Sequence, residues 1–403
     1  MARKRVIYQS EGLYVGTTSG NGHNENLDNG ATIGTVARVG TTPDQLYRVQ
    51  SINYGFDIPR QDVNQFGQLA RIDQVILEQP TVDLDFSYYT ETGYNESRIG
   101  FHVGGSNALS HFLDGSIGKI NADTSVPGSN YYVRVTAEGN DLNIGNETTD
   151  KVIGMGNMFV SNFTAEASVG SFPTTSITAE GMNMKFYSAG QGTNAAHAVP
   201  SVKPSDGSSI TQTFQLPAAT QHEDATQPTA LRPGDVKIGV TSLGLDNKLW
   251  RGVDASELKV QSFSISADMS RENLERLGSK FAYSKELEFP LTATLTLEAI
   301  VSDLVADDIE DIVNDDDSAY DAMIKIYAPN NADDFTPGNT NHAIAYTMKN
   351  MKTDSLSFSS SIGDNKTVSL TATAQMGAKD DTNNGLFISA TGVSAAHGSF
   401  IGE

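Results

Sequence analysis

Carboxylates are the side chains of this sequence whose spacing comes nearest to that of a metal-binding or catalytic site. The densest acidic run, SDLVADDIEDIVNDDDSAYD at 302–321, offers the oxygen ligands that calcium prefers. Around Asp315 and Asp317, however, the run lacks the turn glycine and the terminal glutamate of an EF-hand loop. The alternative is a helix that ends in a solvated acidic loop, with Leu304 on its buried stripe. Among 49 acidic residues, a pair of carboxylates says nothing about catalysis without its geometry.

Other catalytic signatures are missing from the sequence. It contains no cysteine, which excludes a disulfide framework, a thiolate zinc site and a cysteine nucleophile. The seven histidines are scattered without an HExxH pair, and no GxSxG elbow marks a serine nucleophile. We therefore predict that the protein is not an enzyme and that it has no catalytic residue, no metal site and no cofactor.

The net charge restricts the partners. With 27 basic and 49 acidic residues, the chain has a formal net charge of -22, which repels phosphate backbones and anionic lipid surfaces. This argues against adhesive binding of nucleic acid, but not against a surface past which nucleic acid slides. The sequence shows no signal-peptide run and no apolar stretch of membrane-spanning length. We therefore expect no membrane insertion and a protein made in a cytoplasm.

The elements that must position these residues are mostly strands. Runs such as TVDLDFSYYT and KTVSLTATAQM alternate apolar and polar residues between Gly, Pro, Asn or Asp, which predicts antiparallel sheets with one buried face. A length of 403 residues exceeds what a single core usually supports, so we expect two domains. The predicted organisation is an N-terminal arm (1–45), a first β domain (46–197), a Pro-rich linker (198–233), a second β domain (234–381) and a C-terminal tail (382–403).

A repeat supports the two domains. The stretch RVQSINYGFDIPRQDVNQFG at 48–67 returns as KVQSFSISADMSRENLERLG at 259–278. Pro59 suits a first helical turn, Ser270 suits an N-cap, and a glycine suits a helix C-terminus, so the pattern predicts a strand followed by a short helix. The identities that define the repeat are Gln50 with Gln261, Asp57 with Asp268, Arg60 with Arg271, and Gly67 with Gly278.

The same spacing of 211 residues continues into the next strand of each half, TVDLDFSYYT and TATLTLEAIV. Because a slip of one residue would move every side chain to the other face, the retained alternation is a stronger argument than the identities. A third pair, SVGSFPTTSITA at 168–179 and SIGDNKTVSLTA at 361–372, follows in the same order. Two copies of a whole domain explain all three matches. The alternative is chance similarity, because Thr, Ser, Val and Leu recur in the strands of any β protein.

The segment RVQSINYGFDIPRQDVNQFGQLARIDQVILEQPTVDLDFSYY resembles the major tail proteins, or tail tube proteins, of long-tailed bacteriophages. The acidic, cysteine-free composition rich in Thr, Ser and Gly resembles them as well. The resemblance is clearest over 46–89, is echoed at 257–300 and is compositional elsewhere. It implies a mainly β chain with two tandem tail-tube-like β-sandwich domains, each with a short flanking helix.

The resemblance also implies a function. A tail tube protein is a structural virion protein whose rings stack into a hollow tube that conducts DNA from the capsid into the host. Such rings hold six tube domains, and relatives with two fused domains close as trimers, which the repeat resembles. The implied partners are further copies of the chain, in a trimer with pseudo-sixfold symmetry, the tape measure protein and other tail proteins, and genomic DNA that passes without tight binding. The implied location is the virion tail, assembled in the host cytoplasm.

An acidic lumen would repel DNA phosphates and let the genome slide. The alternative for the polar side of the long strands is an ordinary solvated outer face. The arm and the tail could become ordered by docking on neighbouring rings. The candidate lumen-facing residues are Asp83, Asp85, Thr292, Thr294, Thr296 and Glu298.

Two other readings stay open at this point. The first is another virion or surface component, such as a capsid decoration protein, a baseplate ring or a fibre-like adhesin. A baseplate ring would share the domain but would not polymerise alone. The second is an enzyme, for instance a glycan-degrading β protein, which would need a cleft with converging carboxylates.

Overall fold

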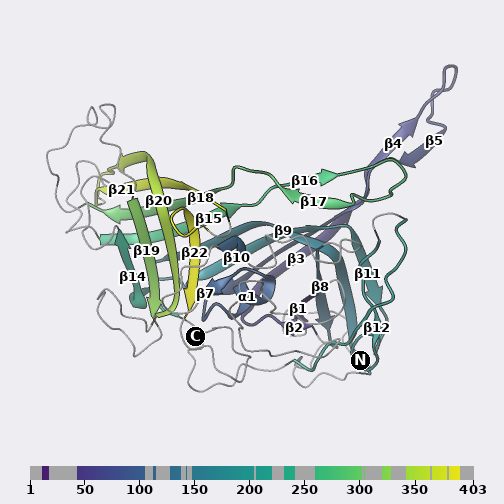
Figure 1. Ribbon diagram of the computed structural model, residues 1–403, viewed down its shortest axis with the longest axis horizontal. Helices are drawn as coiled ribbons and strands as arrows, with labels where there is room; N and C mark the ends of the chain where they lie inside the picture. Colours follow the sequence, from purple (N-terminus) through teal and green to yellow (C-terminus); the bar gives the residue numbers. More distant parts are fainter. Residues whose placement is uncertain are drawn as a thin grey trace.

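The computed structural model describes residues 11–17, 43–104, 112–114, 128–137, 142, 148–203, 206–219, 231–240, 259–301, 304, 320–327, 342–363, 365–378 and 381–390. Within these ranges the chain is mainly β (Figure 1). The elements of its first part are β1 (Glu11–Thr17), β2 (Asp44–Gln45), β3 (Val49–Asp57), β4 (Arg60–Val63), β5 (Asp73–Ile76), β6 (Thr81–Tyr89), α1 (Tyr94–Ile99), β7 (Val103–Gly104), η2 (Phe112–Asp114), β8 (Ser129–Val135), β9 (Lys151–Ser168), β10 (Thr174–Gly181) and β11 (Asn183–Tyr187). There follow β12 (His197–Ala198), β13 (Thr213–Phe214), η4 (Pro233–Asp235), β14 (Val236–Val240), β15 (Lys259–Asp268), β16 (Arg271–Leu274), β17 (Ser284–Leu287), β18 (Thr292–Ile300), β19 (Tyr320–Tyr327), β20 (His342–Ser359), β21 (Thr367–Gln375) and β22 (Gly385–Ala390).

Both halves of the chain repeat one strand-pairing pattern. In the first half, β9 pairs with β8 and β11 along its first part and with β10 along its second part, and β10 leads to β6 and β3. In the second half, β20 pairs in the same way with β19, β22 and β21, and β21 leads to β18 and β15. A long strand in each half therefore belongs to two layers. Asn157 and Asn350 have φ values of 55° and 56° at the same point of these strands, in the left-handed region that asparagine tolerates best after glycine.

The two halves join edge to edge in one long sheet. Its central path runs through eight strands in the order β3, β6, β10, β9, β15, β18, β21 and β20. The antiparallel pairing of β9 with β15 is the junction between the halves. All neighbours along this path are antiparallel, as the alternating sequence predicts.

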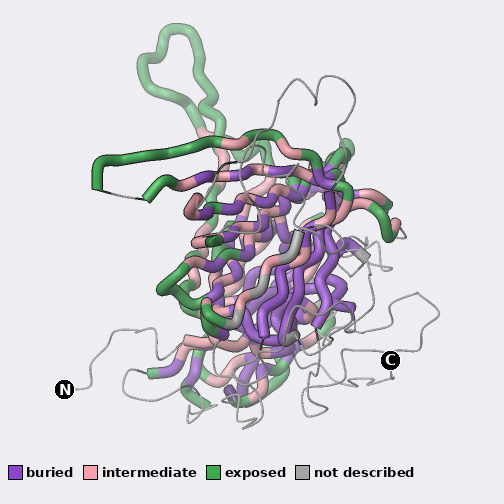
Figure 2. Tube along the Cα trace, turned by 90° about the vertical axis from the view of Figure 1, so that its left-hand side faces the viewer, coloured by how far each residue is buried: buried purple, intermediate pink, exposed green. Residues whose placement is uncertain are grey.

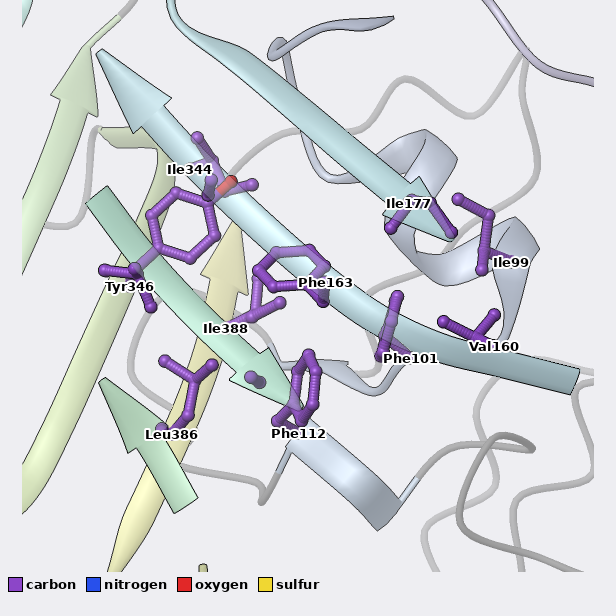
Figure 3. Packing of buried hydrophobic residues seen from close by; sticks show 14 of the residues in the cluster. Ile99, Phe101, Phe112, Val160, Phe163, Ile177, Ile344, Tyr346, Leu386 and Ile388 are labelled. Atoms are coloured by element: carbon purple, nitrogen blue, oxygen red, sulfur yellow. The ribbon is translucent and has the colours of Figure 1, made fainter. Parts of the chain in front are cut away.

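One face of this long sheet is buried under the second layer of strands. Phe86 of β6 lies 5.9 Å from Tyr131 of β8, and Phe163 of β9 lies 6.3 Å from Tyr346 of β20, measured between ring centroids. Figure 3 shows Phe163 beside Tyr346 and Ile388, with Phe101 and Phe112 below them. Buried apolar residues of both halves belong to one continuous cluster. The halves thus share a core, and their status as two separate domains stays a prediction.

The prediction of a short helix after each repeated strand is wrong. The segments that follow β3 and β15 form two β-hairpins, β4–β5 and β16–β17. A helix of this length is marginal unless one face is buried, and β4 and β5 are almost entirely exposed (Figure 2). Gly67 and Gly278, with φ of 87° and 86°, provide the turn of each hairpin rather than a helix end. Among the described residues the single α-helix is α1, which follows β6.

The predicted arm and tail are partly built into the body. Within the arm, β1 pairs with β8 and buries Leu13 and Val15; within the tail, β22 pairs with β20 and buries Leu386 and Ile388. These strands are short, so the surrounding glycine and asparagine dominated the local composition. The described part of the predicted linker contains β13 and the end of β12, with which β13 pairs, and it packs Phe214 and its neighbours against β8 and β11. Most other residues of the arm and tail, and most of the acidic run at 302–321, lie outside the described residues. Leu304 is described, and it is exposed, not buried.

Candidate functional surfaces: a polar sheet face and two open edges

The candidate lumen residues lie on the solvent face of the long sheet. In β6, Val82, Leu84 and Phe86 are buried, whereas Asp83 and Asp85 between them are exposed. In β18 the same alternation leaves the candidate side chains on the outer face: Thr292 and Glu298 exposed, Thr294 and Thr296 half-buried. The strands pair within one sheet, so both sets of candidates share one surface.

Cross-strand pairing extends this polar surface over all eight strands. One row runs from Asn53 through Asp85, Thr178 and Asn162 to Asp268. Serine and threonine fill most of the remaining positions of that face. The register places on it the carboxylates Asp57, Asp83, Asp85, Glu166, Glu180, Asp268 and Glu298, and the lysines Lys259 and Lys352. The face is therefore hydroxyl-rich and acidic.

Crowding of carboxylates is visible in the acidity of Asp83. Burial raises the pKa of Asp83, and the negative charges of Glu180, Asp85 and Asp57 raise it further, while Lys285 lowers it. Lys285 makes an ion pair with Glu180, with 3.5 Å between Nζ and Oε2. The carboxylates outnumber the lysines on this face, and a net negative field repels a polyanion.

The repeat-defining glutamines have a local structural role. Gln50 Nε2 donates to the Arg48 carbonyl oxygen at 3.0 Å, and Gln261 Nε2 donates to that of Lys259 at 3.1 Å. In both strands the register shifts at this glutamine, between residues 49 and 51 and between residues 260 and 262. Each glutamine thus marks the same β-bulge.

The other repeat-defining residues belong to the hairpins. Asp57 and Asp268 end β3 and β15 on the polar face. Arg271 donates through Nε to the Val160 carbonyl oxygen at 3.3 Å and lies over the Phe159 ring; burial lowers its pKa to about 10. Arg60, at the same position of β4, is exposed.

The junction between the halves is an ordered antiparallel ladder. Ser262 to Asp268 of β15 pair with Ser168 to Asn162 of β9. The Val169 N–H donates to the Gln261 carbonyl at 2.9 Å, and the Met269 N–H donates to that of Ser161 at 2.8 Å. The odd-numbered residues of β15 therefore form the hydrogen-bonded pairs with β9, and the even-numbered ones point their N–H groups at β18.

The two ends of the long sheet are the open counterparts of this junction. Among the described strands, β3 pairs only with β6, and the last part of β20 (352–359) pairs only with β21. β3 corresponds to β15, and this part of β20 corresponds to the part of β9 that receives β15. Phe56 on β3 is 58% exposed and Phe358 on β20 is 46% exposed, whereas their counterparts in the junction, Ala267 and Ala165, are buried.

The sequence alone does not reveal these edges. Phe56 and Phe358 stand in strands where apolar residues are expected, and only the pairing order shows that no second described strand flanks them. A signal was present at the hairpins, because Phe66, Leu69 and Leu77 of the first copy align with Leu277, Lys280 and Glu288 of the second. The first hairpin is thus more apolar than its copy.

Signs of other site classes are sparse in the part of the chain that the structure describes. No group of three or more His, Asp or Glu is placed there to hold a metal ion. No helix within the described ranges is long and apolar enough to cross a membrane. No protein-family model and no curated protein matches the chain.

Proposed function

We propose that this protein is a structural, non-catalytic subunit that assembles head to tail into rings, and that the rings stack into a tube through which DNA passes. The observation that carries the proposal is the β9–β15 junction, because both of its sides recur as open edges at the ends of the same sheet. A sheet with two unpaired, complementary edges is a template for adding further copies. A head-to-tail contact generates a ring where the rotation closes.

The junction inside the chain gives the register between copies. Applied to β3 and β20, it places Asn53 opposite Ser359, Tyr54 opposite Phe358, and Phe56 opposite Leu356. Tyr54 and Phe56 then take the places of Ile265 and Ala267, whose side chains are buried in the internal junction. Pairing therefore covers the apolar residues that the single chain leaves exposed.

The polar face supports a conduit for nucleic acid. Closure of a sheet with one buried and one polar face turns one of the two toward the axis, and the second layer of strands already covers the apolar face. The hydroxyl-rich, acidic face then lines the lumen and repels phosphates. Three copies, with two equivalent halves each, give the six positions that the resemblance to tail tube proteins implies. The same proposal places the protein in the virion tail, with the tape measure protein and other tail proteins as partners.

A disulfide between copies tests this register, because the chain contains no cysteine of its own. Asn53 and Ser359 form a non-hydrogen-bonded pair in the proposed ladder, where Cα atoms lie about 4.5 Å apart, within the range that a disulfide spans. We expect the variant Asn53→Cys/Ser359→Cys to oxidise to a covalent trimer under non-denaturing conditions. The control, Asn53→Cys/Ser355→Cys, is off register by four residues, or about 13 Å, and should stay unlinked.

Electron microscopy and mass measurement complete the test. Stacked rings with six density lobes and a mass of three chains are the expected result. Rings that never stack would indicate a baseplate-like ring instead of a tube. A folded monomer at every concentration, without cross-links, would refute the proposal and favour a decoration protein or adhesin.

A further inference from the structure

Among the described residues, the β4–β5 hairpin and its stem carry more exposed large apolar side chains than any other element. It stands away from the sheets at one end of the molecule (Figures 1 and 2). Phe66 and Leu69 near its tip are 103% and 110% exposed. The other exposed apolar residues of this hairpin and its stem are Val63, Ile72, Val75, Ile76 and Leu77. Such a concentration of exposed apolar side chains marks an interaction surface.

The second hairpin shows what this element does when a neighbour is present. β16–β17 lies against the middle of β9 and the end of β10, on the half of the chain that its own β15 pairs with (Figure 1). Arg271 bonds to the backbone of β9, and Lys285 reaches Glu180 of β10. Toward its tip, the Ala282 N–H donates to Gln79 Oε1 at 2.8 Å, beside the start of β6. This hairpin therefore clamps the junction that its strand forms.

We infer that β4–β5 is an intermolecular clamp: it docks on the second copy of this chain whose β20 pairs with β3, across the middle of β20 and the end of β21. The inference rests on the proposed function. In the proposed contact between copies, β3 takes the place of β15 and β20 takes the place of β9, so β4–β5 takes the place of β16–β17. The hairpins agree in strand bounds, pairing register and the φ of the turn glycine. The partner of β4–β5 is a second copy of this chain, because β20 and β21 are the equivalents of β9 and β10, on which β16–β17 docks within the chain.

The residues of β4 and β5 and those of their proposed docking site on β20 and β21 differ from the equivalent internal pairs in a matched way. Lys285 and Glu180, an ion pair in the chain, correspond to Gln74 and Thr373, so both charges disappear together. The aromatic contact is not reproduced, since Lys352 stands in the place of Phe159. Val63 and Ile76 supply apolar contact area there, as their half-buried equivalents Leu274 and Leu287 do in β16–β17. An interface between separate copies needs more such area than one within a chain, because it opposes the loss of translational freedom.

The experiment compares two variants of this hairpin in the Asn53→Cys/Ser359→Cys background. Val63→Ser/Ile76→Ser removes two exposed apolar side chains of β4–β5 whose equivalents in the docked β16–β17, Leu274 and Leu287, are half-buried. Phe66→Ser/Leu69→Ser is the matched control at the tip, because Leu277, the equivalent of Phe66, is 104% exposed in the docked hairpin. Because burying one such side chain changes an equilibrium by roughly tenfold or more, we expect the concentration for half-assembly to rise at least about tenfold in the first variant. The control should assemble like the parent.

A second measurement detects the contact directly. In an otherwise cysteine-free chain, Gln74→Cys/Thr373→Cys should be joined between copies by a short bismaleimide reagent at assembling concentrations. Normal assembly of Val63→Ser/Ile76→Ser, together with absence of the Gln74–Thr373 cross-link, would overturn the clamp and leave the proposed ring intact. Absence of the Asn53–Ser359 disulfide in every background would overturn the ring, and the clamp with it.

Discussion

A buried carboxyl group between the two halves makes the stability of the protein depend on pH. Glu96 lies in α1 and is 1% exposed, close to Tyr88 of β6 and Tyr346 of β20; Thr175 donates to its Oε1 at 3.4 Å. Burial raises the pKa of Glu96 from 4.5 to about 7, against the opposing effect of hydrogen bonds from the backbone, Tyr88 and Thr175. The folded state therefore holds the proton that the unfolded chain releases.

The size of the effect follows from linkage. A pKa raised from 4.5 to about 7 corresponds to about 3 kcal/mol, because one pKa unit is about 1.4 kcal/mol. This contribution is fully present below pH 4.5 and is lost as the pH rises through 7. The variant Glu96→Gln keeps the shape and has no proton to lose. We expect it to gain up to about 3 kcal/mol over the parent between pH 4.5 and 8.

Urea unfolding of both proteins measures this difference at a series of pH values, at a concentration at which neither assembles. The parent and Glu96→Gln should have similar stability near pH 4.5 and diverge toward pH 7, and the difference should stay constant above about pH 8. Parallel pH profiles would show that Glu96 is charged or solvated in the folded protein and would refute the reasoning.

Three further predictions follow from buried pairs, backbone geometry and the polar face. Arg134→Met should cost about 3–5 kcal/mol in thermal unfolding, because Arg134 donates through Nε and Nη2 to the fully buried Asp150 at 3.0 and 2.8 Å, and the carboxylate is left uncompensated; a cost below 1 kcal/mol would contradict it. Gly128→Ala should lower stability by more than about 1 kcal/mol, since Gly128 has φ of 92° and a Cβ there lies 2.8 Å from the Asn157 carbonyl carbon; Gly55→Ala, with no atom within 4 Å of its Cβ, is the control. Assemblies of Asp85→Lys/Glu298→Lys should retain DNA in a filter assay, with retention that falls steeply as salt increases, because phosphate contacts release counterions; equal retention by the parent would place these residues away from the conduit.

The sequence predicts those features that depend on local periodicity. The alternation in β6 and β18 fixes which residues are buried, and it correctly puts Asp83, Asp85 and Glu298 on the solvent face. The spacing of 211 residues also holds through all four strands, since Arg60–Val63 recurs as Arg271–Leu274 and Thr81–Tyr89 as Thr292–Ile300.

Features that depend on distant partners are not predictable in this way. A glycine after a polar run fits a helix end and a hairpin turn equally well, and the difference at Gly67 is made by the pairing of β4 with β5. Likewise, β1 and β22 are ordered by β8 and β20, which lie far away in the sequence. β9 and β20 each belong to both layers, and this determines which strands lie at the ends of the long sheet. The local sequence of neither strand predicts it.

If the chain assembles as proposed, the covalent connection across the β9–β15 junction has a kinetic consequence for forming the ring. A ring of six equal, unlinked halves needs five encounters in solution before the sixth contact closes it, and each encounter loses translational and rotational entropy. A chain that carries two halves has already made every second contact at an effective concentration set by its own linker. In the proposed ring, three such chains need only two encounters before closure. Assembly would then pass through fewer kinds of incomplete ring, and each of them would be shorter-lived.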